Sequence, residues 1–571
     1  MNFGSLPIDA KSILALQWSE YEPYYQELEA RELSKENIAA WLDDWSRLAE
    51  TADEHYWRLF IATTVNTADP LSKEAFDTYI ENIQPAIKRA EQSLKDKLLA
   101  SGLSPKSFET ALRRLRAETE IFTEENLPLL ADELKLVTDY NELIGSLTVL
   151  WEGEERTRAQ MLALQYEPDR SIRQRAWEAV QAQLLKRRHN INELWEKFVP
   201  LRLKIAKNAG MPDYRAYMWK QRFRFDYSPE DCKSFHDAIA KVVVPAAQRI
   251  YEKRRQRLGI EAVRPWDVNV DPLGDTPIKP YEALDEFKSK ACAIFTQVDP
   301  KFGEYFQIMM DEGLLDLESR KNKAPGAYSL GLHAAHRPFI FMSNTHTSSD
   351  VQTILHEGGH AFHEFERAHV HFYQRGEIYL PAEFAEVASM GMELIASPYK
   401  TKEYGGFYAE SEAARAMIEL LEGFITFWPY MALVDAFQHW VYENPMDGSD
   451  ASKCESRWGE LWDRFMIGID YSGLEEAKKT YWHKQPHPFD SPFYYVEYGI
   501  ALLGAVQVWG NTRKDQAQAV AQYRKALALG ATVPLPQLFA AAGAKFAFDA
   551  ETLKGVVDLM EEVIAEMEAK L

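Results

Sequence analysis

A repeating spacing of apolar residues, at intervals of three and four positions, restricts the fold of this chain more than any other feature. The spacing continues from about Lys35 to Lys207, with Leu112 and Leu115 as an example, and it resumes over Tyr408 to Tyr442 and Tyr498 to Leu571. Such spacing gathers apolar side chains on one face of a helix. The sequence therefore predicts a mostly α-helical fold.

Two short stretches depart from the helical pattern. Gly326 to Leu332 and Pro338 to Met342 are bounded segments rich in aromatic and β-branched residues, and they predict a small β-sheet. A third stretch, Val263 to Pro280, is rich in proline and aspartate and predicts an ordered surface loop that marks a lobe boundary. The chain has 571 residues, so we expect two or more lobes rather than one domain.

Charge and cysteine content exclude several classes of protein. The formal net charge of -22 predicts a surface that repels phosphate backbones and acidic membranes, so we expect no nucleic-acid partner and no membrane association. The three cysteines lack the spacing of a zinc ribbon or redox motif and are expected to be reduced and mostly buried. No secretion signal is visible at the N-terminus, and the apolar stretch Ile500 to Trp509 is too short to cross a bilayer. These observations predict a cytoplasmic protein.

An H-E-x-x-H motif predicts a metal site with a general base beside it. His356 and His360 are separated by one helical turn, about 6 Å of rise, so both imidazoles can bind one zinc ion. Glu357 lies beside that face and can take a proton from a water on the metal, acting as general base. Ser349 to Gln352 has the spacing of a capping box that would open this helix. Gly358 and Gly359 disfavour a helix interior, which suggests that another group approaches the backbone closely there.

A catalytic zinc ion needs a third protein ligand. His363 lies too far along the same helix, about 10 Å from His356, and is expected to pack or to support the site. A second helix beginning near Pro381 carries Glu383, Glu386 and Glu393 on nearly one side. One of these carboxylates can bind the metal while the others orient the histidines.

Four motifs together resemble the M3 family of zinc metallopeptidases, the thimet oligopeptidase and oligoendopeptidase F group. The resemblance spans roughly Tyr214 to Ala547 and is weaker before that. In chain order, the motifs are G-A-Y-S at Gly326 to Ser329, H-E-G-G-H-A-F-H at His356 to His363, A-E-V-A-S at Ala385 to Ser389, and H-P-F-D-S-P-F-Y-Y-V-E-Y at His487 to Tyr498.

The resemblance implies roles for several residues. Glu386 would be the third zinc ligand, with one zinc ion per chain, and Glu383 and Glu393 would be supporting carboxylates. His487 and Tyr498 would lie over the substrate carbonyl and stabilise its developing negative charge. Val496 stands where many relatives have tyrosine, so which of two neighbouring tyrosines contacts substrate is left open. The candidates for substrate contact are Gly326, Ala327, Tyr328, Tyr494 and Tyr495.

The resemblance also implies an architecture. It predicts a multi-helical, two-lobed metallopeptidase with a small sheet beside the zinc helix and a deep channel that admits short peptides. An exposed strand edge would bind an extended peptide through main-chain hydrogen bonds and tolerate many side chains. We expect an N-terminal helical region over residues 1–205 and a catalytic region over residues 206–571.

The sequence thus predicts a zinc-dependent endopeptidase that hydrolyses internal bonds of short oligopeptides, with Glu357 as general base. One alternative is a metallocarboxypeptidase on a similar helical scaffold, which would need a cationic residue for the substrate's terminal carboxylate. Another is a non-catalytic peptide-binding protein with a structural zinc ion. The sequence leaves open the cleavage-site preference, the length limit, the physiological peptide, the extent of lobe closure and the oligomeric state.

Overall fold

The computed structural model describes residues 2–274, 278–376 and 380–571, and it is mostly helical, as predicted. The chain divides into two compact units, each assembled from three segments. The first comprises Met1–Arg116, Ile278–Ala413 and Gly504–Phe546, and the second comprises Ala117–Pro277, Ala414–Leu503 and Ala547–Leu571. The boundary after residue 277 falls inside the Pro- and Asp-rich stretch, as predicted, although residues 275–277 lie outside the described part. The predicted division at residue 205 stays a prediction.

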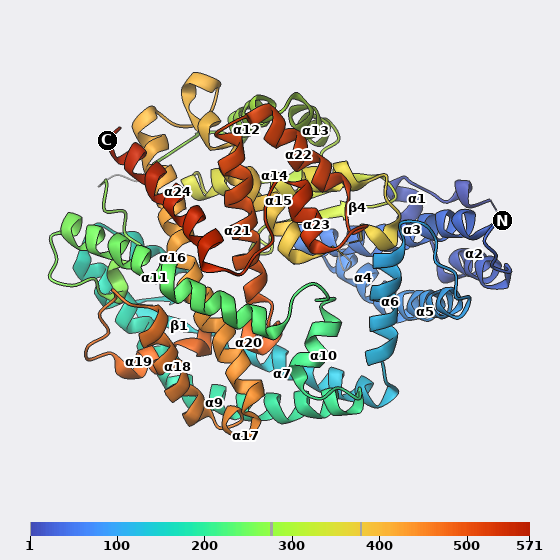
Figure 1. Ribbon diagram of the computed structural model, residues 1–571, viewed down its shortest axis with the longest axis horizontal. Coiled ribbons are helices and arrows are strands. Elements are labelled where there is room, and N and C mark those ends of the chain that lie inside the picture. Colours follow the sequence, from blue (N-terminus) through green and yellow to red (C-terminus); the bar gives the residue numbers. More distant parts are fainter. Residues whose placement is uncertain (1, 275–277, 377–379) are drawn as a thin grey trace. The chain divides into compact units, whose positions relative to one another are not determined.

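The first unit consists of an N-terminal group of helices, a small sheet and the helices that follow it. Its helices, apart from those that contain a unit boundary, are α1 (Ala10–Leu14), α2 (Trp18–Ala30), α3 (Ile38–Val65), α4 (Pro70–Asn82), α5 (Gln84–Ala100), α12 (Leu284–Val298), α13 (Pro300–Asp311), α14 (Ser348–Arg367), α15 (Ala382–Ile395), α22 (Gln516–Ala528) and α23 (Leu535–Ala541). Helices α14 and α15 lie side by side, and α22 packs against α14 (Figure 1).

The predicted sheet is present in this unit. Strands β4 (Tyr328–Leu332) and β5 (Arg337–Phe341) pair antiparallel with Tyr328 opposite Phe341. The two-residue strand β3 (Leu315–Asp316) adds to β5 in parallel, which leaves β4 at an edge of the order β3-β5-β4. Both β4 and β5 pack against α14. The sheet therefore supports one side of the helix that carries the H-E-x-x-H motif.

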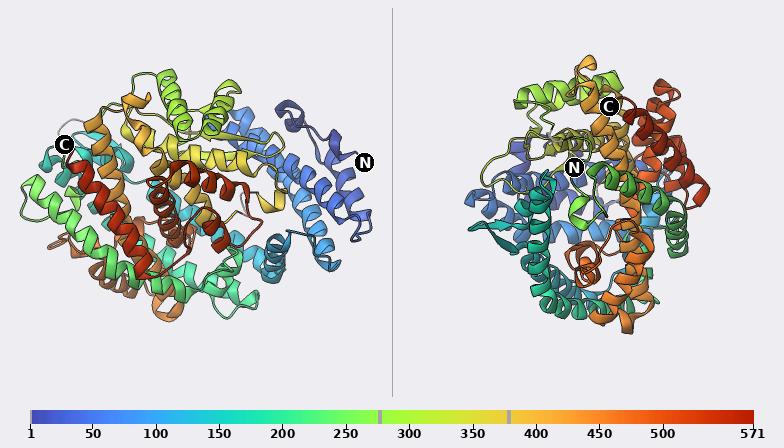
Figure 2. Two further views of the ribbon diagram at one scale, coloured as in Figure 1. Left: turned by 45° about the horizontal axis from the view of Figure 1, so that its top comes forward. Right: turned by 90° about the vertical axis from the view of Figure 1, so that its left-hand side faces the viewer.

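The second unit is built on long helices. Its helices are α7 (Leu127–Gly145), α8 (Arg158–Ala163), α9 (Arg170–Asn208), α10 (Tyr214–Gln221), α11 (Pro229–Leu258), α17 (Pro445–Gly448), α18 (Ala451–Phe465), α19 (Glu475–Lys479), α20 (His487–Asp490) and α24 (Ala550–Glu568). Helices α11 and α24 run side by side, in green and red in the left view of Figure 2. The unit boundaries at residues 116, 413 and 503 fall within α6 (Glu109–Ile121), α16 (Glu410–Glu443) and α21 (Tyr495–Thr512).

A β-hairpin interrupts the region in which the sequence predicted one helix after another. Strands β1 (Thr148–Trp151) and β2 (Glu154–Thr157) pair antiparallel around Glu152 and Gly153, which have φ values of 52° and 89°. Two consecutive left-handed residues give the backbone twist that a two-residue hairpin needs. The stretch is short and lies between long helical patterns, so the helical prediction was wrong here.

Membrane and cysteine features can also be compared with the structure. Among the described residues, α16 is long and apolar enough to span a bilayer by length and composition, and 61% of the relevant window is buried in the protein. The three cysteines are free thiols, with Cys232 and Cys454 buried and Cys292 partly buried. The prediction of reduced, mostly buried cysteines is confirmed.

Candidate metal centre

Helix α14 begins about two turns before the motif, with a reciprocal cap. The backbone N–H of Thr347 donates to Asp350 Oδ2 at 3.0 Å, and the Thr347 side chain accepts from the third helical residue in return. Asp350 also accepts from Tyr281 Oη at 2.5 Å, so the cap is tied to a neighbouring segment. The capping box is therefore formed by Thr347 and Asp350, and the predicted pair of Ser349 and Gln352 was wrong by two positions. A cap of this kind fixes where the helix starts and hence which way its side chains point.

The two motif glycines allow close packing, as predicted. A Cβ atom at Gly359 would lie 2.5 Å from the carbonyl oxygen of Ala388 and 2.6 Å from Cα of Ser389, both in the backbone of α15. A Cβ atom at Gly358 would lie 2.5 Å from the ring of Phe295. Only glycine lets α15 approach so closely, and this approach sets the distance between side chains on the two helices.

Three donor groups converge where α14 and α15 meet. His356 Nε2 lies 3.4 Å from Glu386 Oε2, and His360 Nε2 lies 3.7 Å from the same oxygen. One ligand atom from each of the three residues lies within 4.8 Å of the other two. The imidazole rings are 5.0 Å apart and nearly perpendicular, at 82°. Two imidazole nitrogens and a carboxylate at this spacing match the ligand set of a catalytic zinc ion.

Further side chains hold these donors in place. Glu393 Oε1 lies 2.5 Å from His356 Nδ1, so that ring nitrogen donates to the carboxylate and Nε2 is left to act as a ligand. The other oxygen of Glu393 accepts from Gln352, whose own amide oxygen accepts from Lys400 at 3.0 Å. Sequence reasoning missed Gln352, although its position one turn before His356 puts it on the same face of the helix.

The third donor, Glu386, is held in place by a hydrogen bond from a residue of its own helix, α15. Ser389 Oγ donates to Glu386 Oε2 at 2.8 Å. Burial alone would raise the pKa of Glu386, but the hydrogen bond to His356 and the charge of His360 oppose it and hold the pKa at about 2. A carboxylate that stays ionised in a buried site is suited to binding a cation.

Glu357 on α14 and the remaining predicted carboxylate, Glu383 on α15, are both buried side chains. The Glu357 side chain is buried, and this burial raises its pKa to about 7 despite the nearby charge of His356. Glu383, in the first turn of α15, is buried as well. A carboxyl group with a pKa near neutrality can both accept and return a proton.

His363 takes no part in the donor set. Its ring is buried 6.0 Å from the ring of Phe384, and among the described residues neither of its nitrogens has a hydrogen-bond partner. Burial lowers its pKa well below the usual range, so the ring is neutral. It packs, as predicted.

The predicted substrate-binding residues at the start of β4 lie at the edge of the sheet. Gly326 has a φ of 102°, which favours glycine, and Ala327 follows it just before the strand. The Tyr328 ring stacks on Phe341 with centroids 4.7 Å apart, and its hydroxyl is 2.6 Å from that of Thr64. The Tyr328 side chain is therefore engaged in packing, while the strand itself is an edge strand.

The second unit contains the other predicted group, which surrounds His487. The rings of Tyr494, Tyr495 and Tyr498 lie 6.1, 4.5 and 6.3 Å from the His487 ring, respectively. Gln485 Nε2 lies 2.6 Å from His487 Nδ1 and donates to it. Burial lowers the pKa of His487, so the ring is neutral and carries its proton on Nε2.

Tyr430 fixes the orientation of that glutamine. Its hydroxyl donates to Gln485 Oε1 at 2.9 Å, which turns the amide nitrogen of Gln485 toward His487. Neither Tyr430 nor Gln485 was predicted, because α16 is distant in sequence and Gln485 precedes the matching motif.

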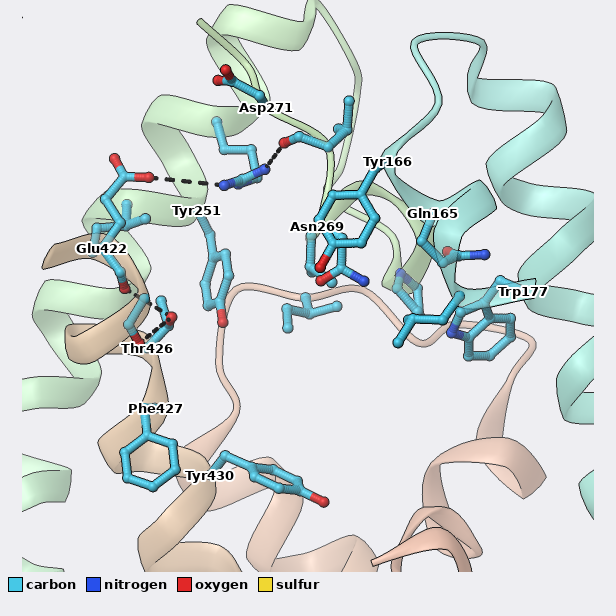
Figure 3. Close-up of a pocket in the computed structure, with 18 of the residues that line it drawn as sticks. Gln165, Tyr166, Trp177, Tyr251, Asn269, Asp271, Glu422, Thr426, Phe427 and Tyr430 are labelled. Carbon is cyan, nitrogen blue, oxygen red and sulfur yellow. Dashed lines mark hydrogen bonds and ion pairs between the residues drawn. The ribbon is translucent and has the colours of Figure 1, made fainter. Parts of the chain in front are cut away.

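An aromatic cavity of about 550 Å³ lies in the second unit (Figure 3). Phe427 and Tyr430 of α16 line one side of it, and Tyr166 and Trp177 line another. The cavity adjoins the His487 group, because Phe427 also contacts Tyr495 at a ring distance of 5.5 Å. None of the three metal donors lines it.

Comparisons with known proteins give a consistent result. A family model described as Peptidase family M3 matches residues 163–557. Oligopeptidase PepF of Bacillus subtilis is 24% identical over 59% of this chain and 49% of its own length. An oligoendopeptidase F homolog of Borreliella burgdorferi is 23% identical over 89% of this chain and 81% of its own length. The chain thus spans about half the length of the first of these relatives.

Solved structures show the same fold. A structure described as PZ peptidase A with inhibitor 2 is similar with a TM-score of 0.84 and 26% identity, and the match covers 99% of both chains.

Proposed function

Because this chain belongs to peptidase family M3, we propose that it is a zinc-dependent endopeptidase that hydrolyses internal bonds of short oligopeptides. The observation that carries the proposal is the convergence of His356, His360 and Glu386 within 4.8 Å of one another. Relatives described as oligopeptidase and oligoendopeptidase support the choice of substrate class.

The donor set fits zinc. His356, His360 and Glu386 would hold the ion, and three protein ligands are the number that leaves a catalytic zinc ion an open position. Glu393 would keep His356 in the tautomer that a ligand needs, and Glu383 would support the same group of side chains. When bound, zinc supplies a Lewis acid that polarises a carbonyl and makes water more acidic.

Glu357 moves the protons. Its carboxylate accepts a proton from the attacking water and returns it to the nitrogen of the leaving amine. Burial raises its pKa to about 7 and the charge of a bound zinc ion would lower it, so the group could both accept and return a proton near neutral pH.

His487 and Tyr498 stabilise the carbonyl oxygen as negative charge develops on it. Because Gln485 donates to His487 Nδ1, the Nε2–H of His487 remains available as a donor. A preorganised donor of this kind is typically worth about 3 kcal/mol in the transition state. The hydroxyl of Tyr498 provides the second donor.

The peptide backbone would pair with the exposed edge near Gly326, Ala327 and Tyr328, which makes binding largely independent of sequence. Tyr494 or Tyr495 would contact the substrate from the His487 group. We further propose a deep channel that excludes folded proteins, as the family resemblance implies. We also propose a cytoplasmic location, which is consistent with three free cysteines.

The test is hydrolysis of a quenched-fluorescent peptide with an amidated C-terminus, since a carboxypeptidase could not cut it. Glu357→Gln should retain zinc while kcat falls by about 10²–10⁴-fold. Glu304→Gln, an isosteric change at an exposed site on α13, is the matched control and should leave kcat unchanged. Retained turnover in Glu357→Gln would overturn the role of Glu357, and a wild-type protein that binds zinc but cuts no peptide would overturn the enzyme assignment.

A further inference from the structure

A second group of metal-binding side chains lies in the second unit. Helix α11 contributes Cys232 and His236, and α16 contributes Asp435 and His439. Within each helix the two residues are four positions apart, so they share a face. All four side chains are buried. Cys232, Asp435 and His439 each offer a ligand atom within 4.8 Å of the other two.

The contacts within this group leave donors and acceptors unused. His236 Nε2 donates to Asp435 Oδ2 at 2.8 Å, and His439 Nε2 is 3.4 Å from the same oxygen. Among the described residues, Asp435 Oδ1 and His439 Nδ1 make no hydrogen bond, and His439 Nε2 has only its 3.4 Å contact with Asp435. Buried polar atoms without partners are rare in folded proteins and call for a ligand.

The surroundings exclude substrate. The rings of Trp219 and Phe493 lie 5.7 and 5.3 Å from the His439 ring, and Asp435 has no exposed surface. A site closed in this way suits an ion that substrate does not reach, and because the described residues offer three ligand atoms, a water enclosed in the site would fill the fourth position of a tetrahedral zinc ion.

We propose that Cys232, Asp435 and His439 bind a structural zinc ion that joins α11 to α16. Thiolate, imidazole and carboxylate are all zinc ligands, and the unpaired Oδ1 of Asp435 is free to coordinate while Oδ2 holds His236. His236 orients the carboxylate and is a positioning residue. Binding releases the thiol proton of Cys232 to solvent. This site is independent of the proposed catalytic zinc ion.

Metal content tests the proposal first. In the variant His356→Ala/His360→Ala, which removes two donors of the first group, the purified protein should retain about one zinc ion per chain by mass spectrometry. Adding Cys232→Ala to this variant should abolish the remainder. A His356→Ala/His360→Ala protein that folds but holds no zinc would overturn the proposal.

Cobalt gives a signal specific to the thiolate. Protein produced in zinc-poor medium with cobalt(II) should show a sulfur-to-cobalt charge-transfer band in the near ultraviolet, because only the second group contains a cysteine. The band should persist in His356→Ala/His360→Ala and in the matched control Cys454→Ala, a second buried thiol, and disappear in Cys232→Ala. Cobalt bound without this band, or a band that survives Cys232→Ala, would contradict the assignment. Failure of the catalytic proposal would leave the band unchanged.

Discussion

Replacing Gly359 by alanine has two effects of opposite sign on the free energy of unfolding. Alanine in a helix interior is favoured over glycine by about 1 kcal/mol. The added Cβ atom, however, would lie 2.5 Å from the Ala388 carbonyl oxygen and 2.6 Å from Ser389 Cα, and backbone atoms cannot move aside as a flexible side chain can. Overpacking of this kind costs about 1–3 kcal/mol, and the rigid contact favours the upper end. We therefore expect a net loss of about 1–2 kcal/mol in the free energy of unfolding.

The same change should weaken zinc binding, because moving α15 away from α14 separates Glu386 from His356. Urea denaturation of the zinc-free protein measures the first effect, and competition with a chelator measures the second. Gly555→Ala is the matched control, since α24 has open space at this position and only the helical gain applies. If Gly359→Ala were as stable as Gly555→Ala, the close approach of the two helices would not be the reason for glycine.

Three further predictions concern the site. Glu393→Gln should lower zinc affinity by about 10–100-fold, measured by chelator competition, because it removes the carboxylate that holds His356; unchanged affinity would contradict this support. Gln485→Leu should lower kcat for the amidated peptide by about tenfold with KM unchanged, since His487 loses the donor that fixes its tautomer; an effect confined to KM would argue against it. Prolonged dialysis against a chelator should abolish hydrolysis and added zinc should restore it, whereas full activity of protein shown to be metal-free would exclude metal catalysis.

In the first unit, local sequence patterns predicted the helices that carry the metal donors but not all the contacts between them. The helix carrying His356 and the neighbouring helix carrying Glu386 were predicted, because spacing along a helix fixes which residues share a face. The glycine pair also predicted a close approach at this point. The identity of the approaching group could not be read from the sequence, since Ala388 and Ser389 come near through tertiary packing.

Hydrogen bonds between segments that are distant in the sequence could not be predicted. Lys400 is linked to Glu393 through Gln352, and the hydroxyl of Tyr430 orients Gln485. Neither set of contacts follows from the spacing of residues along one helix. The hairpin around Glu152 was missed because its turn depends on two left-handed residues, and glutamate at such a position is an unusual signal.

The position of bound zinc tests the central claim most directly. Crystals of the zinc-loaded protein, measured with X-rays on either side of the zinc absorption edge, would locate the ion by its anomalous scattering. We predict a peak bounded by His356 Nε2, His360 Nε2 and a carboxylate oxygen of Glu386. Zinc-loaded crystals with these three side chains ordered and no anomalous peak among them would contradict the account.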